Sequence, residues 1–243
     1  MTKIIGIIPC RYQATRLPGK PLADIHGKPM IWHVYHQALK VSLLNDLVIA
    51  TDDHRIAEAC VRFKLNHIMT RDDHHTGTDR LVECSTKFDA DIFVNVQGDE
   101  PMIEPNSIEL VTQAILSDPD PNVMASNGYN KIEQREEAAD LGMVKVVMNK
   151  SKLAMAYSRL PIPYPKGTPT PYYRQLGLYA FRKQGLEIFG NEKPGPLELA
   201  EGVEMLRFLE NGFAVRMIET TESASISVDT PEDLERARQL MIP

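Results

Sequence analysis

The sequence predicts an α/β fold built around a mostly parallel central sheet, and three observations support this. Short apolar runs alternate along the chain with segments of helical period, which is the pattern of successive βαβ units. The 243 residues, 43% of them hydrophobic, are enough to bury the core of one domain, or of one domain with a modest extension. The pattern runs along the whole chain without an internal repeat or a low-complexity tail.

The first hundred residues are predicted to contain four strands separated by helices. Each strand is a run of aliphatic or aromatic residues bounded by polar or turn-forming residues. The helical segments carry apolar residues on one face, as Met30, Val34 and Ala38 do. The predicted strands are Ile4–Pro9, Leu47–Ala50, His67–Met69 and Asp91–Val96, and the predicted helices are Pro29–Leu39, Arg55–Phe63 and Asp79–Phe88.

The remainder of the chain is predicted to continue this alternation around one irregular stretch. Five prolines lie between Pro161 and Pro171, which excludes a regular helix or a central strand there. We expect an ordered excursion that carries part of a binding site. The predicted helices are Pro105–Leu116, Glu198–Leu209 and Pro231–Met241, the last capped by Asp229 or Thr230, and the predicted strands are Val123–Ser126, Val144–Met148, Leu176–Phe181 and Ala214–Ile218.

Composition narrows the classes of partner. The formal net charge of −6 argues against the large basic surface that holds a nucleic-acid backbone. The three cysteines have no metal-ligand spacing, which argues against a disulfide framework or a zinc site and fits a reducing cytoplasm. The apolar run Ile4 to Ile8 is too short for a signal-peptide core or a membrane span. We therefore expect a cytoplasmic protein with neither a nucleic-acid nor a membrane partner.

The loop after the first predicted strand gathers positive charge. Arg11, Arg16 and Lys20 lie within ten residues of each other in an otherwise acidic chain. In open α/β sheets ligands bind at the carboxyl ends of the strands, so this loop lies where a substrate would, and a triphosphate would neutralise its three cations. A solvated charged loop is the alternative. The glycine spacing of a Walker loop is absent.

Two carboxylates follow strand-like segments far apart in the chain. Asp99 follows the strand ending at Val96, with Gly98 allowing a close backbone approach, and Asp229 follows a second strand-like stretch. Together they could hold Mg²⁺ beside phosphate groups. Taken alone, Asp229 is more simply interpreted as a helix cap before Pro231.

Six segments in register resemble the CMP-KDO synthetases, the 3-deoxy-manno-octulosonate (KDO) cytidylyltransferases, from about residue 4 to residue 238. The capsule-type members are most similar, on Met69-Thr70-Arg71-x-Asp73-His74 and Ser158-Arg159-x-Pro161-Ile162-Pro163-Tyr164-Pro165. The six segments are Arg11-Tyr12-x-x-Thr15-Arg16-Leu17-Pro18-Gly19-Lys20-Pro21-Leu22, Ala50-Thr51-Asp52-Asp53, His74-x-Thr76-Gly77-Thr78-Asp79-Arg80, Asn95-x-Gln97-Gly98-Asp99-Glu100-Pro101, Val144-Lys145-Val146-Val147 and Val228-Asp229-Thr230-Pro231-Glu232-Asp233.

The resemblance implies a Rossmann-like nucleotidyltransferase fold in a single domain over residues 1–243, with a small dimerisation and sugar-binding extension at about 125–190. It implies a homodimer that converts CTP and KDO into CMP-KDO and pyrophosphate for cell-surface polysaccharide, with Mg²⁺ on Asp99 and Asp229. Arg16 and Lys20 would bind the phosphates. His74 would have a structural role in the nucleotide loop, and a role as catalytic base is the alternative. The remaining expected contacts are Arg11, Thr76, Gly77, Thr78, Arg80 and Gln97 for the nucleotide, and Gln97, Arg159, Gln175, Tyr179, Glu204 and Met205 for the sugar acid.

Two positions on the sugar side depart from the family pattern. Gln175 stands where the family usually has His, and Met205 stands where it commonly has Gln. Losing polar groups from a site that hydrogen-bonds a hydroxyl changes which ligand is accepted. A different acid, such as an amino-KDO, another sugar acid or a phosphonate, is therefore an alternative substrate. A catalytically silent nucleotide-binding relative is a second alternative, and retention of both Asp99 and Asp229 argues against it.

Overall fold

The computed structural model describes residues 2–13, 16–167, 170–220 and 227–241. Its contacts divide the chain into two units. The first unit contains Met1–Glu109 and Glu222–Pro243, and the second contains Leu110–Thr221. The first unit is thus discontinuous in sequence, because the chain leaves it for the second unit and then returns.

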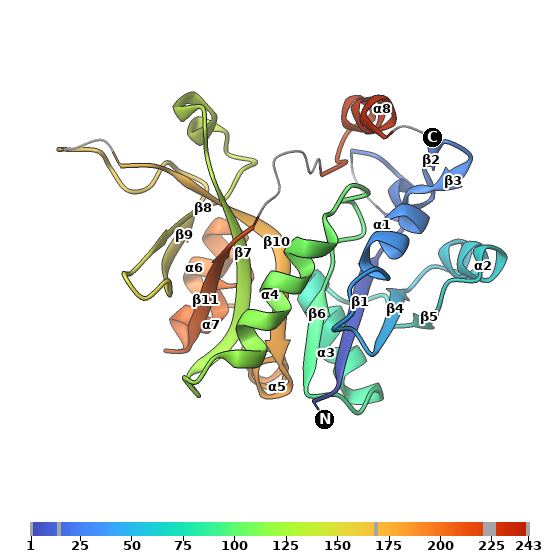
Figure 1. The fold of residues 1–243 in the computed structure, drawn as a ribbon, viewed down its shortest axis with the longest axis horizontal. Helices are drawn as coiled ribbons and strands as arrows, with labels where there is room; N and C mark the ends of the chain where they lie inside the picture. Colours follow the sequence, from blue (N-terminus) through green and yellow to red (C-terminus); the bar gives the residue numbers. More distant parts are fainter. Residues whose placement is uncertain (1, 14–15, 168–169, 221–226, 242–243) are drawn as a thin grey trace. The chain divides into compact units, whose positions relative to one another are not determined.

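The first unit contains a parallel sheet with the strand order β6-β1-β4-β5. Its strands are almost entirely buried, and Ile5, Ile7 and Ile8 expose none of their surface. The α/β class and the mostly parallel sheet predicted from sequence are confirmed (Figure 1). The strands are β1 (Ile4–Cys10), β4 (Asp46–Thr51), β5 (His67–Met69) and β6 (Ile92–Asn95).

Most helices of the first unit begin at side-chain caps, whereas the helix that follows Pro29 does not. In α2 (His54–Phe63) the carboxylate of Asp53 accepts a hydrogen bond from the main-chain N–H of Arg55. In α3 (Gly77–Lys87), Thr76 and Asp79 form a capping box, so the helix starts two residues before the predicted start at Asp79. The other helices are α1 (Met30–Ala38) and α8 (Pro231–Leu240), and the short elements are the 3₁₀ turn η1 (Lys20–Leu22) and the hairpin strands β2 (Asp24–Ile25) and β3 (Lys28–Pro29).

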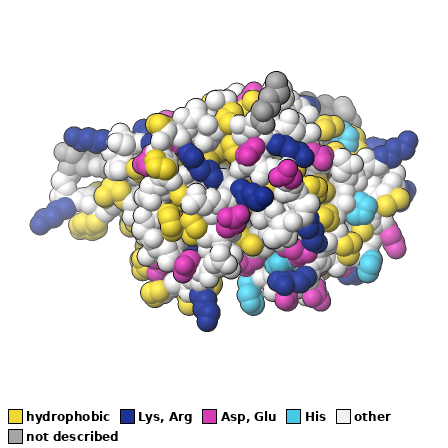
Figure 2. All heavy atoms as spheres, turned by 90° about the horizontal axis from the view of Figure 1, so that it is seen from below, with side chains coloured by type: hydrophobic (Ala, Val, Ile, Leu, Met, Phe, Trp, Pro, Cys, Tyr) yellow, Lys and Arg dark blue, Asp and Glu magenta, His cyan; other side chains and the backbone are white. Residues whose placement is uncertain are grey.

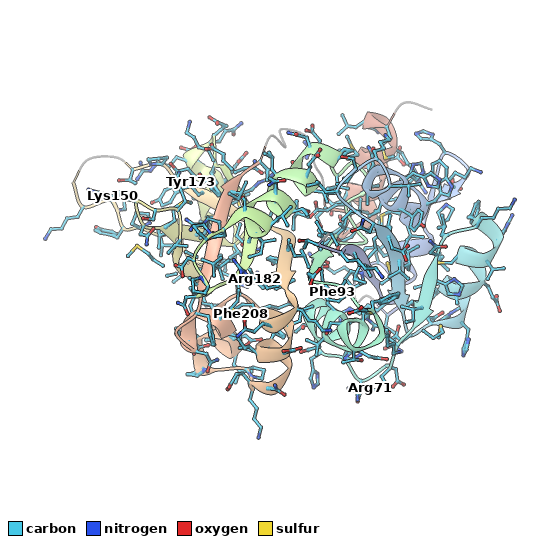
Figure 3. The ribbon with its side chains drawn as sticks, turned by 60° about the horizontal axis from the view of Figure 1, so that its bottom comes forward. Arg71, Phe93, Lys150, Tyr173, Arg182 and Phe208 are labelled. Atoms are coloured by element: carbon cyan, nitrogen blue, oxygen red, sulfur yellow. The ribbon has the colours of Figure 1, made fainter. Side chains whose placement is uncertain are left out.

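The second unit contains a mixed sheet. Strand β7 (Val123–Lys131) pairs parallel with β11 (Ala214–Glu219) and antiparallel with β10 (Tyr173–Arg182). Strand β8 (Lys145–Met148) pairs antiparallel with β9 (Ala154–Ser158) and with β10. Among the core residues are Phe181 and Phe208, whose rings lie 6.1 Å apart; Phe208 is labelled in Figure 3. The helices are α4 (Pro105–Ser117), which spans the boundary in sequence, α5 (Lys183–Asn191), α6 (Pro196–Glu201) and α7 (Leu206–Glu210), with the 3₁₀ turn η2 (Arg135–Ala139).

One predicted helix is wrong. The segment Glu198–Leu209 is divided between α6 and α7 because Gly202 adopts a left-handed backbone, with φ of 63°, and ends α6. Strand β9, helix α5 and the β2–β3 hairpin were not predicted. The proline-rich stretch forms neither helix nor strand over its described residues, as expected.

No helix formed by the described residues combines the length and the apolar character needed to cross a membrane. On the face drawn in Figure 2, Lys and Arg side chains lie among Asp and Glu side chains.

Candidate functional site

A cleft of about 390 Å³ opens in the first unit beyond the carboxyl ends of β1 and β6. Nine residues expected from the sequence line it, whereas Thr78 is fully buried within α3 and does not. Pro9, Cys10, Gln13, His74 and Gly98 complete the wall and were not predicted as ligand contacts. The nine are Arg11, Arg16, Lys20, Thr76, Gly77, Arg80, Gln97, Asp99 and Asp229.

The basic loop on one side of this cleft has a defined shape over its described residues, 11–13 and 16–20. The main-chain N–H of Gly19 donates to the carbonyl of Tyr12 at 2.9 Å, and Gly19 has φ of 70°. A Cβ at Gly19 would lie 3.0 Å from the Tyr12 ring, so this position favours glycine on both backbone and steric grounds. The Arg55 guanidinium lies 3.3 Å from the centroid of the same ring. These contacts argue against a freely solvated loop.

Lys20 joins the two carboxylates. Its Nζ lies 2.6 Å from Oδ2 of Asp99 and 3.0 Å from Oδ1 of Asp229. Arg16 Nη2 lies 3.0 Å from the other oxygen of Asp229. Burial lowers the pKa of Lys20, but its bonds to Asp99 and Asp229 outweigh that effect and raise the pKa above its ordinary value. Lys20 therefore stays charged at neutral pH.

A main-chain hydrogen bond holds the segments that carry the two carboxylates next to each other. The N–H of Val228 donates to the carbonyl of Asp99 at 2.9 Å, which brings the segment before α8 to the turn after β6. Thr230, not Asp229, caps α8, since its hydroxyl accepts from the N–H of Asp233. The carboxylate of Asp229 is thus directed at Lys20 and Arg16 instead of at the helix end.

Gly98 permits the close approach of this turn to β1. A Cβ at Gly98 would lie 2.5 Å from Cys10 Sγ and 3.1 Å from the carbonyl of Pro9. Burial raises the pKa of the Cys10 thiol well above its ordinary value, so the residue is a neutral packing group beneath the cleft.

The donor set of Asp99 and Asp229 fits a divalent cation that also binds phosphate. Both carboxylates already converge on one positive charge, the ammonium of Lys20. Mg²⁺ is commonly held by one or two carboxylates with substrate phosphates completing its shell. No group of three or more His, Cys, Asp or Glu side chains suited to a metal occurs among the described residues, so the pair would need phosphate oxygens as further ligands.

Arg80 is buried on the other side of the cleft and is held by two residues that the sequence did not single out as site residues. Its Nη2 donates to Oδ2 of Asp52 at 3.1 Å, and its Nη1 donates to the hydroxyl of Thr70. A buried guanidinium with two such partners has one orientation. The position of Asp52 could have indicated this role, because Asp52 directly follows β4 within the segment Ala50-Thr51-Asp52-Asp53 that resembles the family.

His74 lies beside Arg80 in the cleft wall and is anchored by Glu83. Its Nε2 lies 2.6 Å from Oε2 of Glu83, and this oxygen also accepts from the N–H of Arg71. The other carboxylate oxygen, Oε1, accepts from Lys87 Nζ. Burial raises the pKa of Glu83, but these hydrogen bonds dominate and bring it down to about 2. This network supports the loop before α3, and sequence reasoning had expected a supporting role for His74.

The residues expected to bind the sugar acid, apart from Gln97, belong to the second unit. Gln175 Nε2 donates to Tyr179 Oη at 2.6 Å. Met205 exposes none of its surface in this structure. Direct contact of Met205 with a ligand therefore stays a prediction. Contact of Glu204 with the acid also stays a prediction.

Arg159 is held by main-chain carbonyls. Its Nε donates to the carbonyl of Glu201 at 2.7 Å and its Nη1 to that of Leu141 at 2.9 Å. The buried ammonium of Lys145 donates to the carbonyls of Arg159 itself, of Asp140 and of Met143. Burial lowers the pKa of Lys145. Lys145 thus ties the Arg159 segment to the turn that contains Leu141, a role that the sequence did not reveal.

Comparison with known proteins identifies close relatives over nearly the whole length. A family model described as cytidylyltransferase matches residues 5–223. The chain is 43% identical over 242 residues to the 3-deoxy-manno-octulosonate cytidylyltransferase of Escherichia coli, covering 99% of this chain and 97% of the relative. It is 42% identical over 240 residues to the enzyme of that name from Solibacter usitatus (strain Ellin6076), covering 98% and 94%.

Comparison with solved structures gives the same family and the same fold. The structure of CMP:2-keto-3-deoxy-manno-octonic acid synthetase complexed with CTP superposes with a TM-score of 0.93 at 43% identity, covering 99% of this chain and 98% of that one. A cytidylyltransferase from Leptospira borgpetersenii shares the fold with a TM-score of 0.68 at 15% identity, covering 100% and 89%.

Proposed function

Because this chain belongs to the cytidylyltransferase family, we propose that it transfers the CMP part of CTP to 3-deoxy-manno-octulosonate and releases pyrophosphate. The product is an activated sugar for cell-surface polysaccharide. The observation that carries the proposal is the convergence of Asp99, Asp229, Lys20 and Arg16 in one cleft of the first unit.

The reaction is an in-line displacement at phosphorus. The anomeric hydroxyl oxygen of the acid forms a bond to the α-phosphorus of CTP, and the bond from that phosphorus to the oxygen between the α- and β-phosphates breaks. That oxygen leaves on pyrophosphate, and the hydroxyl proton passes to solvent. Such a step depends on positioning and on charge neutralisation. Lys20 and Arg16 would exchange their carboxylate partners for phosphate oxygens when the triphosphate enters. Their positive charges then lie where negative charge develops on the leaving group.

Asp99 and Asp229 would hold the divalent cation, which we propose is Mg²⁺. When bound, the cation would neutralise phosphate charge and polarise the α-phosphate. The carboxylates orient it from two segments that the Val228 hydrogen bond keeps in register.

The nucleotide would lie along the α3 side of the cleft. Thr76 and Gly77 present the N-terminal end of α3, which favours negative charge. Arg80, fixed by Asp52, and Arg11 on the basic loop would contact the base and ribose side. Gln97 lines the same cleft and could contact either substrate.

The acid would be bound through residues of the second unit. Arg159 suits a carboxylate because a guanidinium can bind two oxygens at once. Gln175, Tyr179 and Glu204 would contact hydroxyl groups, and Met205 would shape the wall behind them.

A homodimer is proposed through the segment at about 125–190. Four of its large apolar side chains are more than half exposed in the single chain, namely Leu141, Met155, Leu160 and Tyr164. Buried apolar area drives such association. Sedimentation equilibrium would measure the mass, and a monomer at working concentrations would contradict this part. A cytoplasmic location likewise remains a proposal.

The decisive experiment is pyrophosphate release from CTP with a panel of acids: KDO, 8-amino-KDO, another sugar acid and a phosphonate. We expect turnover with KDO in the presence of Mg²⁺. Turnover with a different acid alone would assign that acid as the substrate, and no turnover with any acid would favour a catalytically silent relative.

A further inference from the structure

The strand that carries Gln175 and Tyr179 is distorted between them. In β10 three residues separate Gln175 from Tyr179, whereas in β7 only Gly128 separates their partners Tyr129 and Asn127. Two extra residues are therefore accommodated in β10. In a regular strand, residues four apart would lie roughly 13 Å from each other. Here the bulge brings the two side chains into hydrogen-bond contact at 2.6 Å.

Asn127 holds this bulge from the opposite strand. Its Nδ2 donates to the carbonyl of Leu176 at 2.8 Å and to that of Leu178 at 3.0 Å. Both acceptors lie among the extra residues of β10, and Gln175 Nε2 also donates to the Leu176 carbonyl. Asn127 is fully buried, so its amide would be costly to bury without these bonds.

The orientation of the Asn127 amide is fixed from its other end. Tyr157 Oη lies 3.3 Å from Asn127 Oδ1. Burial raises the pKa of Tyr157 well above its ordinary value, so the phenol keeps its proton and can donate. Carbonyl oxygens only accept, which requires the NH₂ group of Asn127 to face Leu176 and Leu178. A chain of hydrogen bonds thus runs from Tyr157 through the Asn127 amide to the bulge.

The residue opposite the bulge leaves room for it. A Cβ at Gly128 would lie 3.1 Å from Thr220 Cγ2 and 3.5 Å from Leu176 Cδ1. At the start of β10, Tyr173 packs edge-on against Tyr129, with ring centroids 5.3 Å apart, and closes the paired region before the bulge; Tyr173 is labelled in Figure 3. Regular pairing with β7 precedes the bulge from Tyr173 to Gln175 and follows it from Tyr179 to Phe181, so the distortion is bounded on both sides.

We propose that Asn127 is a positioning residue that determines acid specificity by holding the β10 bulge that joins Gln175 to Tyr179. This inference rests on the proposed function, in which Gln175 and Tyr179 face the acid. Asn127 touches no substrate. It sets the spacing of two side chains that do, so its loss affects recognition of the acid and leaves binding of CTP in the first unit unchanged.

The test compares Asn127→Asp with Ser126→Ala. The first change keeps the shape of the side chain and replaces the donor with an oxygen facing two carbonyls. The second removes a buried hydroxyl of the same strand, which donates to the carbonyl of Val111 at 2.6 Å and lies 3.4 Å from the carbonyl of Ala180 beyond the bulge. We expect this change to leave the bulge intact. For Asn127→Asp we expect KM for the acid to rise about 10-fold or more while KM for CTP changes less than about twofold. For Ser126→Ala we expect neither KM to change by more than about twofold.

If Asn127→Asp fails to fold, Tyr157→Phe tests the same proposal. It removes the hydroxyl that orients the amide, which also lies 3.2 Å from Met217 Sδ, and we expect a smaller rise in KM for the acid in the same direction. Crystal structures of the variants give a readout that needs no activity. In Asn127→Asp, or in Tyr157→Phe if that is the variant that folds, we expect the separation of Gln175 Nε2 and Tyr179 Oη to exceed hydrogen-bond distance.

Two results would overturn the proposal: an unchanged Gln175–Tyr179 contact in the variant structure, or an equal rise in KM for the acid in Ser126→Ala. Failure of the proposed function is a separate outcome. It would be seen as absence of turnover by the unaltered protein with every acid, and the crystal structures would still decide whether Asn127 holds the bulge.

Discussion

The ammonium of Lys20 lies 2.6 Å from Oδ2 of Asp99, so one ion pair joins the basic loop after β1 to the turn after β6. Both side chains are largely shielded from solvent, which strengthens their attraction relative to a surface pair. The same nitrogen lies 3.0 Å from Asp229. In the protein without substrate, Lys20 and Arg16 together thus balance the charges of the two carboxylates that we assign to the metal.

Removing either carboxylate charge should abolish turnover. Asp99→Asn and Asp229→Asn keep the side-chain volume but leave one carboxylate for a divalent cation, and we expect kcat to fall at least about 100-fold. Steady-state pyrophosphate release at millimolar Mg²⁺ measures this. Asp24→Asn, at an exposed carboxylate of the same unit, is the control. Near-normal activity in Asp99→Asn would remove that residue from the metal site, and in Asp229→Asn it would do the same for Asp229.

CTP should be preferred over ATP and GTP. The segment Thr76 to Arg80, which the sequence resemblance assigns to the base side, begins at the cleft and ends at a fixed guanidinium. A rigid arrangement of donors rejects a base whose edge does not match it. Initial rates at equal triphosphate concentration test this, and equal rates with a purine triphosphate would contradict the assignment.

Asp52→Asn should weaken binding of CTP by releasing Arg80. The change removes the charge that Arg80 Nη2 meets at 3.1 Å, and we expect KM for CTP to rise about 5–50-fold with a smaller effect on KM for the acid. Asp53→Asn is the matched control, because the neighbouring carboxylate pairs with the exposed Arg55. If both variants behave alike, the orientation of Arg80 does not depend on Asp52.

Glu83 should contribute stability that is lost in acid. Its pKa is about 2 in the folded protein, against an ordinary value of 4.5. A carboxyl whose pKa is lowered by folding stabilises the protein above its unfolded pKa, and this contribution disappears as pH falls from about 4.5 toward 2. At pH 7 we expect Glu83→Gln to reduce the free energy of unfolding by about 1–3 kcal/mol.

Urea unfolding at several pH values checks this contribution. The difference between the wild type and Glu83→Gln should shrink as pH falls below about 4.5, and Glu58→Gln, at an exposed position, should show little difference at any pH. A difference independent of pH would mean that the charge of Glu83 is not what matters.

Restoring the family residues on the sugar side should shift acid preference. Gln175→His with Met205→Gln alters the group that donates to Tyr179 Oη and places a polar side chain at a fully buried position. We expect kcat/KM for KDO relative to other acids to change about 10–100-fold. Competition between acids in one reaction measures the ratio. No change, with full efficiency on KDO in the unaltered protein, would make the two departures neutral.

The strands and helices of the first unit could be predicted because their residues follow the period of the element that they form. Strand β5 was predicted with its observed bounds, and β1 differed by one residue. The break at Gly202 was missed because a lone glycine inside an apolar helical pattern is often tolerated, and only the backbone shows that it ends α6. Strand β9 was missed because Ala154 and Ala156 give no clear alternation.

The convergence of the basic loop and Asp99 could be expected because each follows a strand that ends at the same edge of the sheet. Residues 227–229 form no strand, and Asp229 reaches this edge through the hydrogen bond of Val228 to Asp99. The partners behind these residues could not be expected. Asp52 and Thr70 meet Arg80 only through the order of β4 and β5, and Asn127 meets the bulge only through the register of β7 with β10. These contacts join residues that are far apart in the sequence, so no local pattern of residues predicts them.

The discontinuity of the first unit has a consequence for synthesis on the ribosome. Asp229 is translated only after the whole of the second unit, yet its carboxylate meets Lys20 near the start of the chain. A nascent chain that has already formed β1, β4, β5 and β6 still lacks half of its carboxylate pair. If Asp229 holds the metal as we propose, a chain that ends before Asp229 is expected not to turn over CTP.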